Sequence, residues 1–236
     1  MKKITMALLA SLIFLSCTMK QEIFLETDGS GTASVQIDLK NFVLPTIEDL
    51  AEVSPDVDPD EMLDPDKIKE SLLENPEISN VTASRPLKNR LRMDFAFDSI
   101  EDLFEQAEED IQSSGLIEIE KIGRETKLTL AINRETYKGF NHLIPNIDDP
   151  TMAALAPDPD MDISERDYLD MIEFFFGDDG PAGVLDSKLD LVINVNGTIT
   201  NQTGGRKLTD SKVEFTVPLI RILLLDTNLE YSITYR

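Results

Sequence analysis

Asp28-Gly29-Ser30-Gly31 sets the first strand pairing of this chain, because it separates two runs with strand character, Gln21–Thr27 and Thr32–Lys40. In the second run apolar residues alternate with Ser34, Gln36 and Asp38. The apolar positions are Ala33, Val35, Ile37 and Leu39. A period of two on either side of a Gly-containing turn is typical of a β-hairpin. The stretch therefore predicts a hairpin near the N-terminal end of the domain.

Further strands are predicted along the rest of the chain. Val81–Arg85 and Leu87–Phe97 read as a second pair around Pro86, and Leu116–Ile122 and Thr126–Asn133 as a third pair around Gly123-Arg124. Three later strands are predicted at Lys188–Thr200, Lys212–Val217 and Asn228–Tyr235. Tight turns join antiparallel strands, whereas parallel pairs need long crossovers. We therefore expect a mostly antiparallel sheet of about nine strands built from hairpins.

Helical segments alternate with these strands. The predicted helices are Asn41–Val53 (interrupted at Pro45), Lys67–Asn75, Ser99–Ser113, Ser164–Phe176 and a short apolar one at Pro218–Leu225. Ser99 and Asp102 form a capping box ahead of an apolar stripe, which is typical of a helix start. The fold class predicted is α+β, with helices packed on the sheet.

The composition excludes several classes of function. The chain has 236 residues, 22 Lys+Arg against 45 Asp+Glu, and a formal net charge of −23. Such an acidic protein repels phosphate backbones, so nucleic acid is excluded as a partner. One Cys and one His exclude internal disulfides and zinc sites built from several Cys or His ligands. We expect no cofactor.

The N-terminus resembles a bacterial lipoprotein signal peptide. Lys2 and Lys3 precede an apolar run, Ile4–Leu15, which is too short to span a bilayer. The run meets Phe14-Leu15-Ser16-Cys17, which is similar to the looser lipoboxes of spirochaetes, and Cys17 is the only cysteine. The alternative is an ordinary secretory signal followed by a chance cysteine. We expect residues 1–16 to be removed and Cys17 to be acylated, so that palmitate labels the protein.

Lipidation would set the location of the mature chain. Cleavage removes two lysines and no acid, which changes the net charge to −25. Thr18 rather than Asp follows the cysteine, and in the enterobacterial sorting rule this resembles an outer-membrane lipoprotein. We expect residues 17–27 to be a lipidated tether leading into the first strand, and residues 21–236 to form the domain.

A faint internal repeat is suggested by two similar segments. Leu44-Pro45-Thr46-Ile47-Glu48-Asp49 precedes Ile144-Pro145-Asn146-Ile147-Asp148-Asp149 by 100 residues. If the repeat is real, the halves are 21–114 and 115–236 and share one sheet. Chance similarity between two βα segments is the alternative.

Three features of the sequence could carry chemistry: two acidic loops, a single histidine and two apolar runs. The loops Asp56-Val57-Asp58-Pro59-Asp60 and Asp158-Pro159-Asp160-Met161-Asp162 carry alternate carboxylates, as calcium loops do. An EF-hand loop also needs Gly at its sixth position and Glu at its twelfth. The sixth positions hold Glu61 and Ile163, and the twelfth hold Lys67 and Leu169. We therefore predict exposed acidic loops and no metal site.

Enzymatic activity is not expected. His142 is the sole imidazole, and no nucleophile motif lies near it in the sequence. Paired carboxylates could cleave sugars, but a chain without Trp offers few stacking platforms for them. No catalytic residue is predicted.

Two apolar runs, Phe174-Phe175-Phe176 and Leu219–Leu225, exceed what one helix face needs. Core packing is the first interpretation. The second is the wall of an apolar cavity that holds a lipid or an acyl chain.

The two ends of the mature chain resemble LppM-type bacterial envelope lipoproteins. At one end the resemblance covers Glu26–Leu39; at the other it covers Leu189–Tyr235, with turns at Asn196-Gly197 and Gly204-Gly205 and a strand ending in Val217-Pro218-Leu219. It implies an α+β envelope domain associated with lipid or glycolipid binding. That family commonly ends in a transmembrane helix, which we do not expect here, so Cys17 would be the single anchor.

The sequence thus favours a non-enzymatic envelope lipoprotein, held in the membrane by its N-terminal lipid, that binds a lipid or an envelope protein. The alternative is a periplasmic-facing protein that binds or hydrolyses a small ligand through His142 or paired carboxylates.

Overall fold

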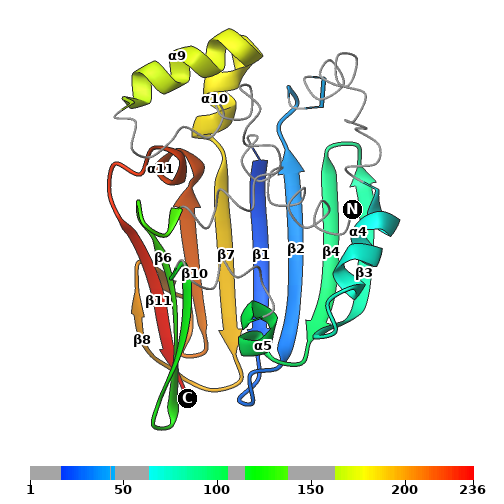
Figure 1. Cartoon of the computed structure of the whole chain (residues 1–236), viewed down its shortest axis with the longest axis vertical. Coiled ribbons are helices and arrows are strands. Elements are labelled where there is room, and N and C mark those ends of the chain that lie inside the picture. The colour runs from blue at the N-terminus through cyan, green and yellow to red at the C-terminus, as the bar shows by residue number, and fades with distance from the viewer. Residues whose placement is uncertain (1–16, 43, 46–63, 106–114, 138–162) are drawn as a thin grey trace.

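The structure is a computed structural model that describes residues 17–42, 44–45, 64–105, 115–137 and 163–236. Within these residues eleven strands form two sheets, and helices pack at their edges and faces (Figure 1). The predicted α+β class is confirmed. The predicted single sheet is wrong, since the strands divide into a seven-stranded sheet A and a four-stranded sheet B.

Sheet A has the strand order β3-β4-β2-β1-β7-β10-β9. Its strands are β1 (Cys17–Leu25), β2 (Gly31–Leu39), β3 (Ile78–Leu87), β4 (Arg90–Phe97), β7 (Lys188–Val195), β9 (Arg206–Lys207) and β10 (Lys212–Pro218). Sheet B has the order β5-β6-β11-β8. Its strands are β5 (Ile117–Ile122), β6 (Glu125–Ile132), β8 (Ile199–Thr203) and β11 (Leu229–Tyr235).

The first hairpin forms as predicted. β1 and β2 pair from Cys17↔Leu39 to Leu25↔Gly31. In the turn the carboxylate of Asp28 accepts hydrogen bonds from the backbone N–H and the hydroxyl of Ser30, at 3.0 and 2.7 Å. These bonds hold the pKa of Asp28 below its usual value.

One pair of strands departs from the antiparallel expectation. β1 lies parallel to β7, from Thr18↔Lys188 to Leu25↔Val195, whereas the other strand pairs are antiparallel. The connection between β1 and β7 is far longer than a hairpin turn. The sequence pattern near either strand therefore gives no sign of their parallel pairing. As a result β1 is the central strand of sheet A.

The structure also departs from the prediction at two places along the strands. β3 continues through Pro86, and the chain turns at Lys88-Asn89 instead. β3 is an edge strand, where a proline without an N–H donor is tolerated. The predicted strand Lys188–Thr200 is broken at Asn196-Gly197, so that β7 belongs to sheet A and β8 to sheet B.

The expected tether over residues 17–27 is likewise not observed. β1 begins at Cys17, and its ladders with β2 and β7 start at residues 17 and 18. Met19, Gln21, Ile23 and Leu25 alternate along one face of this strand. The segment therefore belongs to the domain itself.

The helices are α4 (Pro65–Leu73), α5 (Ile100–Glu105), α9 (Glu165–Phe176), α10 (Asp179–Leu185) and α11 (Leu219–Leu224). The hydroxyls of Ser99 and Ser164 accept hydrogen bonds from the N–H groups of Asp102 and Asp167, each at 3.1 Å, as helix caps. The predicted starts of α5 and α9 are confirmed. The predicted helix Asn41–Val53 falls largely outside the described residues, as does the C-terminal part of Ser99–Ser113.

Sheet A has one apolar and one polar face. At the β10 side the apolar face packs on sheet B, where the rings of Phe215 and Tyr231 meet edge to face with centroids 5.8 Å apart. At the β4 side it packs on α4 through the buried Ile68. These contacts define two hydrophobic clusters on the same face of the sheet.

Candidate functional site: the sheet edge at Cys17

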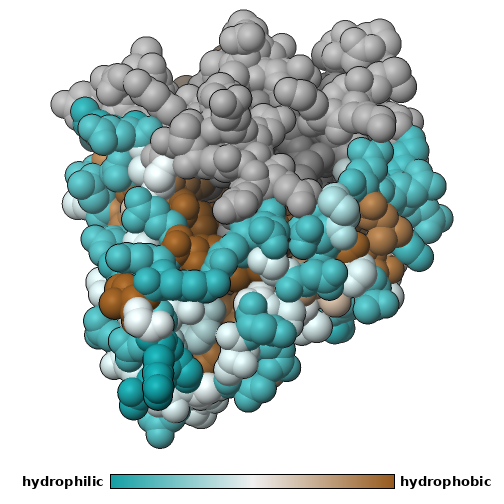
Figure 2. Space-filling model, turned by 60° about the horizontal axis from the view of Figure 1, so that its bottom comes forward, coloured by the Kyte–Doolittle hydropathy of each residue, from teal (hydrophilic) through white to brown (hydrophobic). Residues whose placement is uncertain are grey.

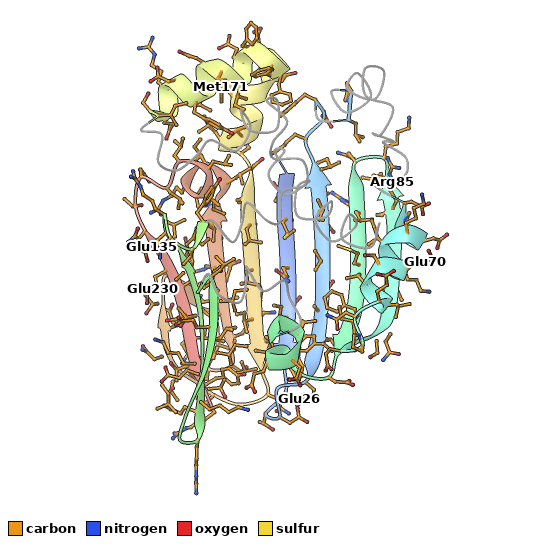
Figure 3. All side chains as sticks on the ribbon, in the orientation of Figure 1. Glu26, Glu70, Arg85, Glu135, Met171 and Glu230 are labelled. Carbon is orange, nitrogen blue, oxygen red and sulfur yellow. The ribbon has the colours of Figure 1, made fainter. Side chains whose placement is uncertain are left out.

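Cys17 lies at the end of the central strand of sheet A. Its backbone is opposite Leu39 of β2, and the next residue, Thr18, is opposite Lys188 of β7. Figure 3 marks the direction of the strand: Glu26, just after β1, lies at one edge of the sheet, and Met171 of α9 lies beyond the other. The second of these is the end of sheet A at which strand β1 begins, and not one of its outer strands. We call this end of the sheet the Cys17 edge.

Helices α9 and α10 are fixed to the Cys17 edge by the start of β7. α10 ends at Leu185, three residues before Lys188. Ser187 between them is buried; its hydroxyl donates to the carbonyl of Gly183 at 2.7 Å, and its own carbonyl accepts from Leu219 N–H at 2.9 Å. Buried polar groups satisfied in this way hold a short connection in one geometry.

Phe42 attaches the two helices to β2 as well. It follows Leu39, the partner of Cys17, by three residues. Its ring lies 5.5 Å from that of Phe176 at the end of α9, centroid to centroid. A Cβ atom on Gly183 of α10 would lie 2.2 Å from Phe42 Cε1, so this close approach needs glycine. Both helices thus contact Phe42, which follows the partner of Cys17 by three residues.

α9 buries one face, exposes Phe174 on another and leaves Phe175 partly exposed. Tyr168 and Ile172 point into the core. Burial raises the pKa of Tyr168, and the phenol of Tyr137 adds to this effect. Phe174 is 84% exposed and Phe175 is 43% exposed, with ring centroids 5.4 Å apart. The helix therefore packs through its Tyr168–Ile172 face and presents an aromatic pair outside the core.

On the other side of Cys17 the edge continues into the turn between β3 and β4. Leu39 N–H donates to the carbonyl of Asn89 at 2.8 Å, and the Asn89 side-chain amide donates to the carbonyl of Leu39 at 3.0 Å. Leu87, the last residue of β3 before this turn, is 52% exposed. Cys17, Leu39 and Asn89 therefore lie in one row across the sheet.

The polar face of sheet A carries paired charges. Asp190 accepts hydrogen bonds from Lys188 and from Thr216 Oγ1, at 2.9 and 2.8 Å. Burial raises the pKa of Asp190, but these two bonds and the charges of Lys188 and Lys20 outweigh burial and hold the pKa below its usual value. Arg90 pairs with Asp38, and Lys212 with Glu22 at 2.7 Å.

The apolar face of sheet A is incompletely buried between its two clusters. The side chains of Ile23, Phe95, Leu189 and Leu191 are only partly buried there. Figure 2 shows apolar patches among hydrophilic residues on the side of the molecule that it draws. An apolar surface with a polar surround is the usual form of a lipid or protein contact.

Each predicted site residue can now be placed. Cys17 lies at the Cys17 edge, whereas His142 and both Asp-Pro loops fall outside the described residues. Leu219–Leu225 packs in the core, as its first interpretation predicted. The Phe174-Phe175-Phe176 run divides: Phe176 packs on Phe42, and the other two rings face outward.

The sequence reasoning missed the outward position of Phe174. A signal for it was available, because Phe174 lies on the opposite side of a helical wheel from Tyr168 and Ile172.

Among the described residues, no group of three or more Cys, His, Asp or Glu side chains could hold a metal ion. Within the same ranges no helix is long and apolar enough to cross a membrane.

Comparison with known proteins gives one similar solved structure, and no protein-family model or curated protein matches the sequence. The similar structure is the NMR structure of the folded domain of LppM from Mycobacterium tuberculosis. It is 12% identical over 94% of this chain and 90% of that chain, with a TM-score of 0.45.

Proposed function

We propose that this protein is a non-enzymatic envelope lipoprotein, held in the outer membrane by acyl chains on Cys17. One observation carries the proposal: the only cysteine of the chain stands directly after a basic and apolar signal-like segment. Acylation would leave Cys17 as the first residue of the mature protein. That residue is also the first residue of β1.

A lipid is needed to hold so acidic a domain at a membrane. The chain from Cys17 onward carries a formal net charge of −25, so anionic headgroups repel it. Each buried methylene contributes about 0.8 kcal/mol, and two or three acyl chains together give stable anchoring. The proposed anchor is therefore sufficient without electrostatic attraction.

The anchor is tested by Cys17→Ala in the full chain. The lipoprotein-specific peptidase requires the modified cysteine, so the variant should remain an uncleaved precursor. Wild type should incorporate labelled palmitate and partition into detergent, and the variant should do neither. Labelling of Cys17→Ala to the wild-type level would contradict the proposal.

We further propose that the domain binds a lipid or an envelope protein through the partly buried apolar face of sheet A. The support is the strip of Ile23, Phe95, Leu189 and Leu191 between the two core clusters. Native mass spectrometry of the protein purified from its host membranes tests this part. A bound lipid that is lost in Leu191→Lys, but kept in the polar-face control Thr216→Lys, supports it. Retention of the lipid by Leu191→Lys contradicts it.

A further inference from the structure

The Cys17 edge carries an aromatic pair that the anchoring proposal does not use. Phe174 is 84% exposed on α9, and Phe175 beside it is 43% exposed. Large apolar side chains that lie outside the core and beside each other mark contact surfaces. Phenylalanine on an amphipathic helix is one of the residues that enter the headgroup region of a bilayer.

The position of the proposed anchor determines what lies against this pair. β1 begins at Cys17, so no flexible segment separates an acyl chain on Cys17 from the sheet. The bilayer must then lie against the Cys17 edge. α9 lies beyond that edge in Figure 3, where Met171 marks it.

Direct contacts hold α9 in this position. Phe42, three residues after the partner of Cys17, touches Phe176 at the end of the same helix. Tyr168 and Ile172 bury one face of α9, and Phe174 lies on the other side of the helix. Phe174 therefore cannot turn inward without unpacking α9 from the core.

We propose that Phe174 and Phe175 insert into the membrane interface to which Cys17 is anchored, so that the domain stands on the bilayer in one orientation. The inference rests on the proposed lipid anchor. Phe174 lies between carboxylates, since Asp170, Glu173 and Asp178 around it are exposed. Repulsion from anionic headgroups then opposes the contact, and neutral lipid favours it.

The test uses the absence of tryptophan from the chain. Phe174→Trp places a single indole on α9, and Ile122→Trp places one at a 48% exposed position in the β5–β6 hairpin, far from the Cys17 edge. Both variants are reconstituted in phosphatidylcholine vesicles. Emission wavelength, acrylamide quenching and quenching by brominated lipids are then measured.

We expect the indole at position 174 to shift to shorter wavelength, to lose most of its acrylamide quenching, and to be quenched by shallowly brominated lipids. The indole at position 122 should show none of these changes. Adding phosphatidylglycerol should weaken the effect at position 174. An indole at 174 that stays as water-exposed as the one at 122, in protein whose mass shows an acylated Cys17, overturns the inference.

A second experiment tests the orientation of the domain independently of whether Cys17 is naturally acylated. If the host protein carries no acyl group, the same variants are expressed from Cys17 onward and coupled through that single thiol to a maleimide lipid in the vesicles. Insertion in this arm supports the orientation, and its absence refutes the orientation.

A photoreactive phenylalanine analogue at position 174 in host cells shows whether a lipid or a protein contacts this residue. Crosslinks to lipid support the inference, and crosslinks mainly to one envelope protein overturn it in favour of a protein partner.

Discussion

Cys17 faces Leu39 across the antiparallel ladder of β1 and β2, at the edge where the central strand of sheet A begins. An acyl group on Cys17 would thus be attached to the sheet itself. A lipoprotein on a flexible tether can move away from its membrane, whereas an acyl group attached in this geometry would hold the domain against the surface.

Protease treatment of the membrane-bound protein tests this geometry. Lys20 lies within the ladders on both sides of β1, so trypsin should not cut after it while the sheet is folded. Mass spectrometry of the released peptides should find none beginning at Gln21. A soluble fragment that begins at Gln21 would show that residues 17–20 form a flexible segment.

The contact between α10 and Phe42 predicts that Gly183→Ala changes the free energy of unfolding in opposite directions with and without the Phe42 ring. In wild type, Gly183→Ala should lower the free energy of unfolding by about 1–2 kcal/mol, because the new Cβ displaces the Phe42 ring. In a Phe42→Ala background the same change should raise it by up to about 1 kcal/mol, because alanine is the better helix former. A double-mutant cycle by urea denaturation measures both. Equal effects in the two backgrounds would mean that the ring does not control this position.

The first hairpin predicts a severe effect at Gly31. A Cβ there would lie 2.1 Å from the carbonyl oxygen of Phe24, which is backbone and cannot move aside. We expect Gly31→Ala to cost about 3 kcal/mol of unfolding free energy. The matched control is Gly29→Asn in the same turn, which meets nothing within 4 Å and has φ +93. It should cost about 1 kcal/mol or less, since asparagine tolerates positive φ. Similar costs at both positions would contradict the hairpin geometry.

The buried phenol of Tyr168 predicts a loss of stability at high pH. Its pKa is raised in the folded state by burial and by Tyr137, so the folded protein keeps a proton that the unfolded chain releases above about pH 10. The contribution is complete below that pH and declines as the pH rises further. Tyr168→Phe should make the decline shallower by up to about 1.4 kcal/mol per pH unit. Unfolding free energies between pH 8 and 11.5 measure this, and an unchanged slope would refute it.

Local patterns predicted local structure well. The Gly-containing turn at Asp28–Gly31, the cap at Ser99, the helix start at Ser164 and the apolar turn at Leu219–Leu225 each depend on neighbours in the sequence, and each was confirmed. Pro86 misled the prediction because proline is as compatible with an edge strand as with a turn. Only the position of β3 in the sheet separates the two cases.

Long-range relationships could not be read from the chain. The parallel pairing of β1 with β7 joins residues that are about 170 positions apart. After β7 the chain leaves sheet A and enters sheet B at β8, with only residues 196–198 between the two strands. The tether was predicted because Thr18-Met19-Lys20 shows no clear alternation, yet ladders on both sides make it a strand. The Cys17 edge consists of such pairings, so it emerged only with the structure.

The mass of the N-terminal peptide from protein extracted from its host membranes tests the central claim most directly. We predict a peptide that begins at Cys17, lacks residues 1–16, and carries a diacylglycerol or triacyl modification on that cysteine. A peptide that begins elsewhere, or an unmodified thiol at Cys17, would contradict the account.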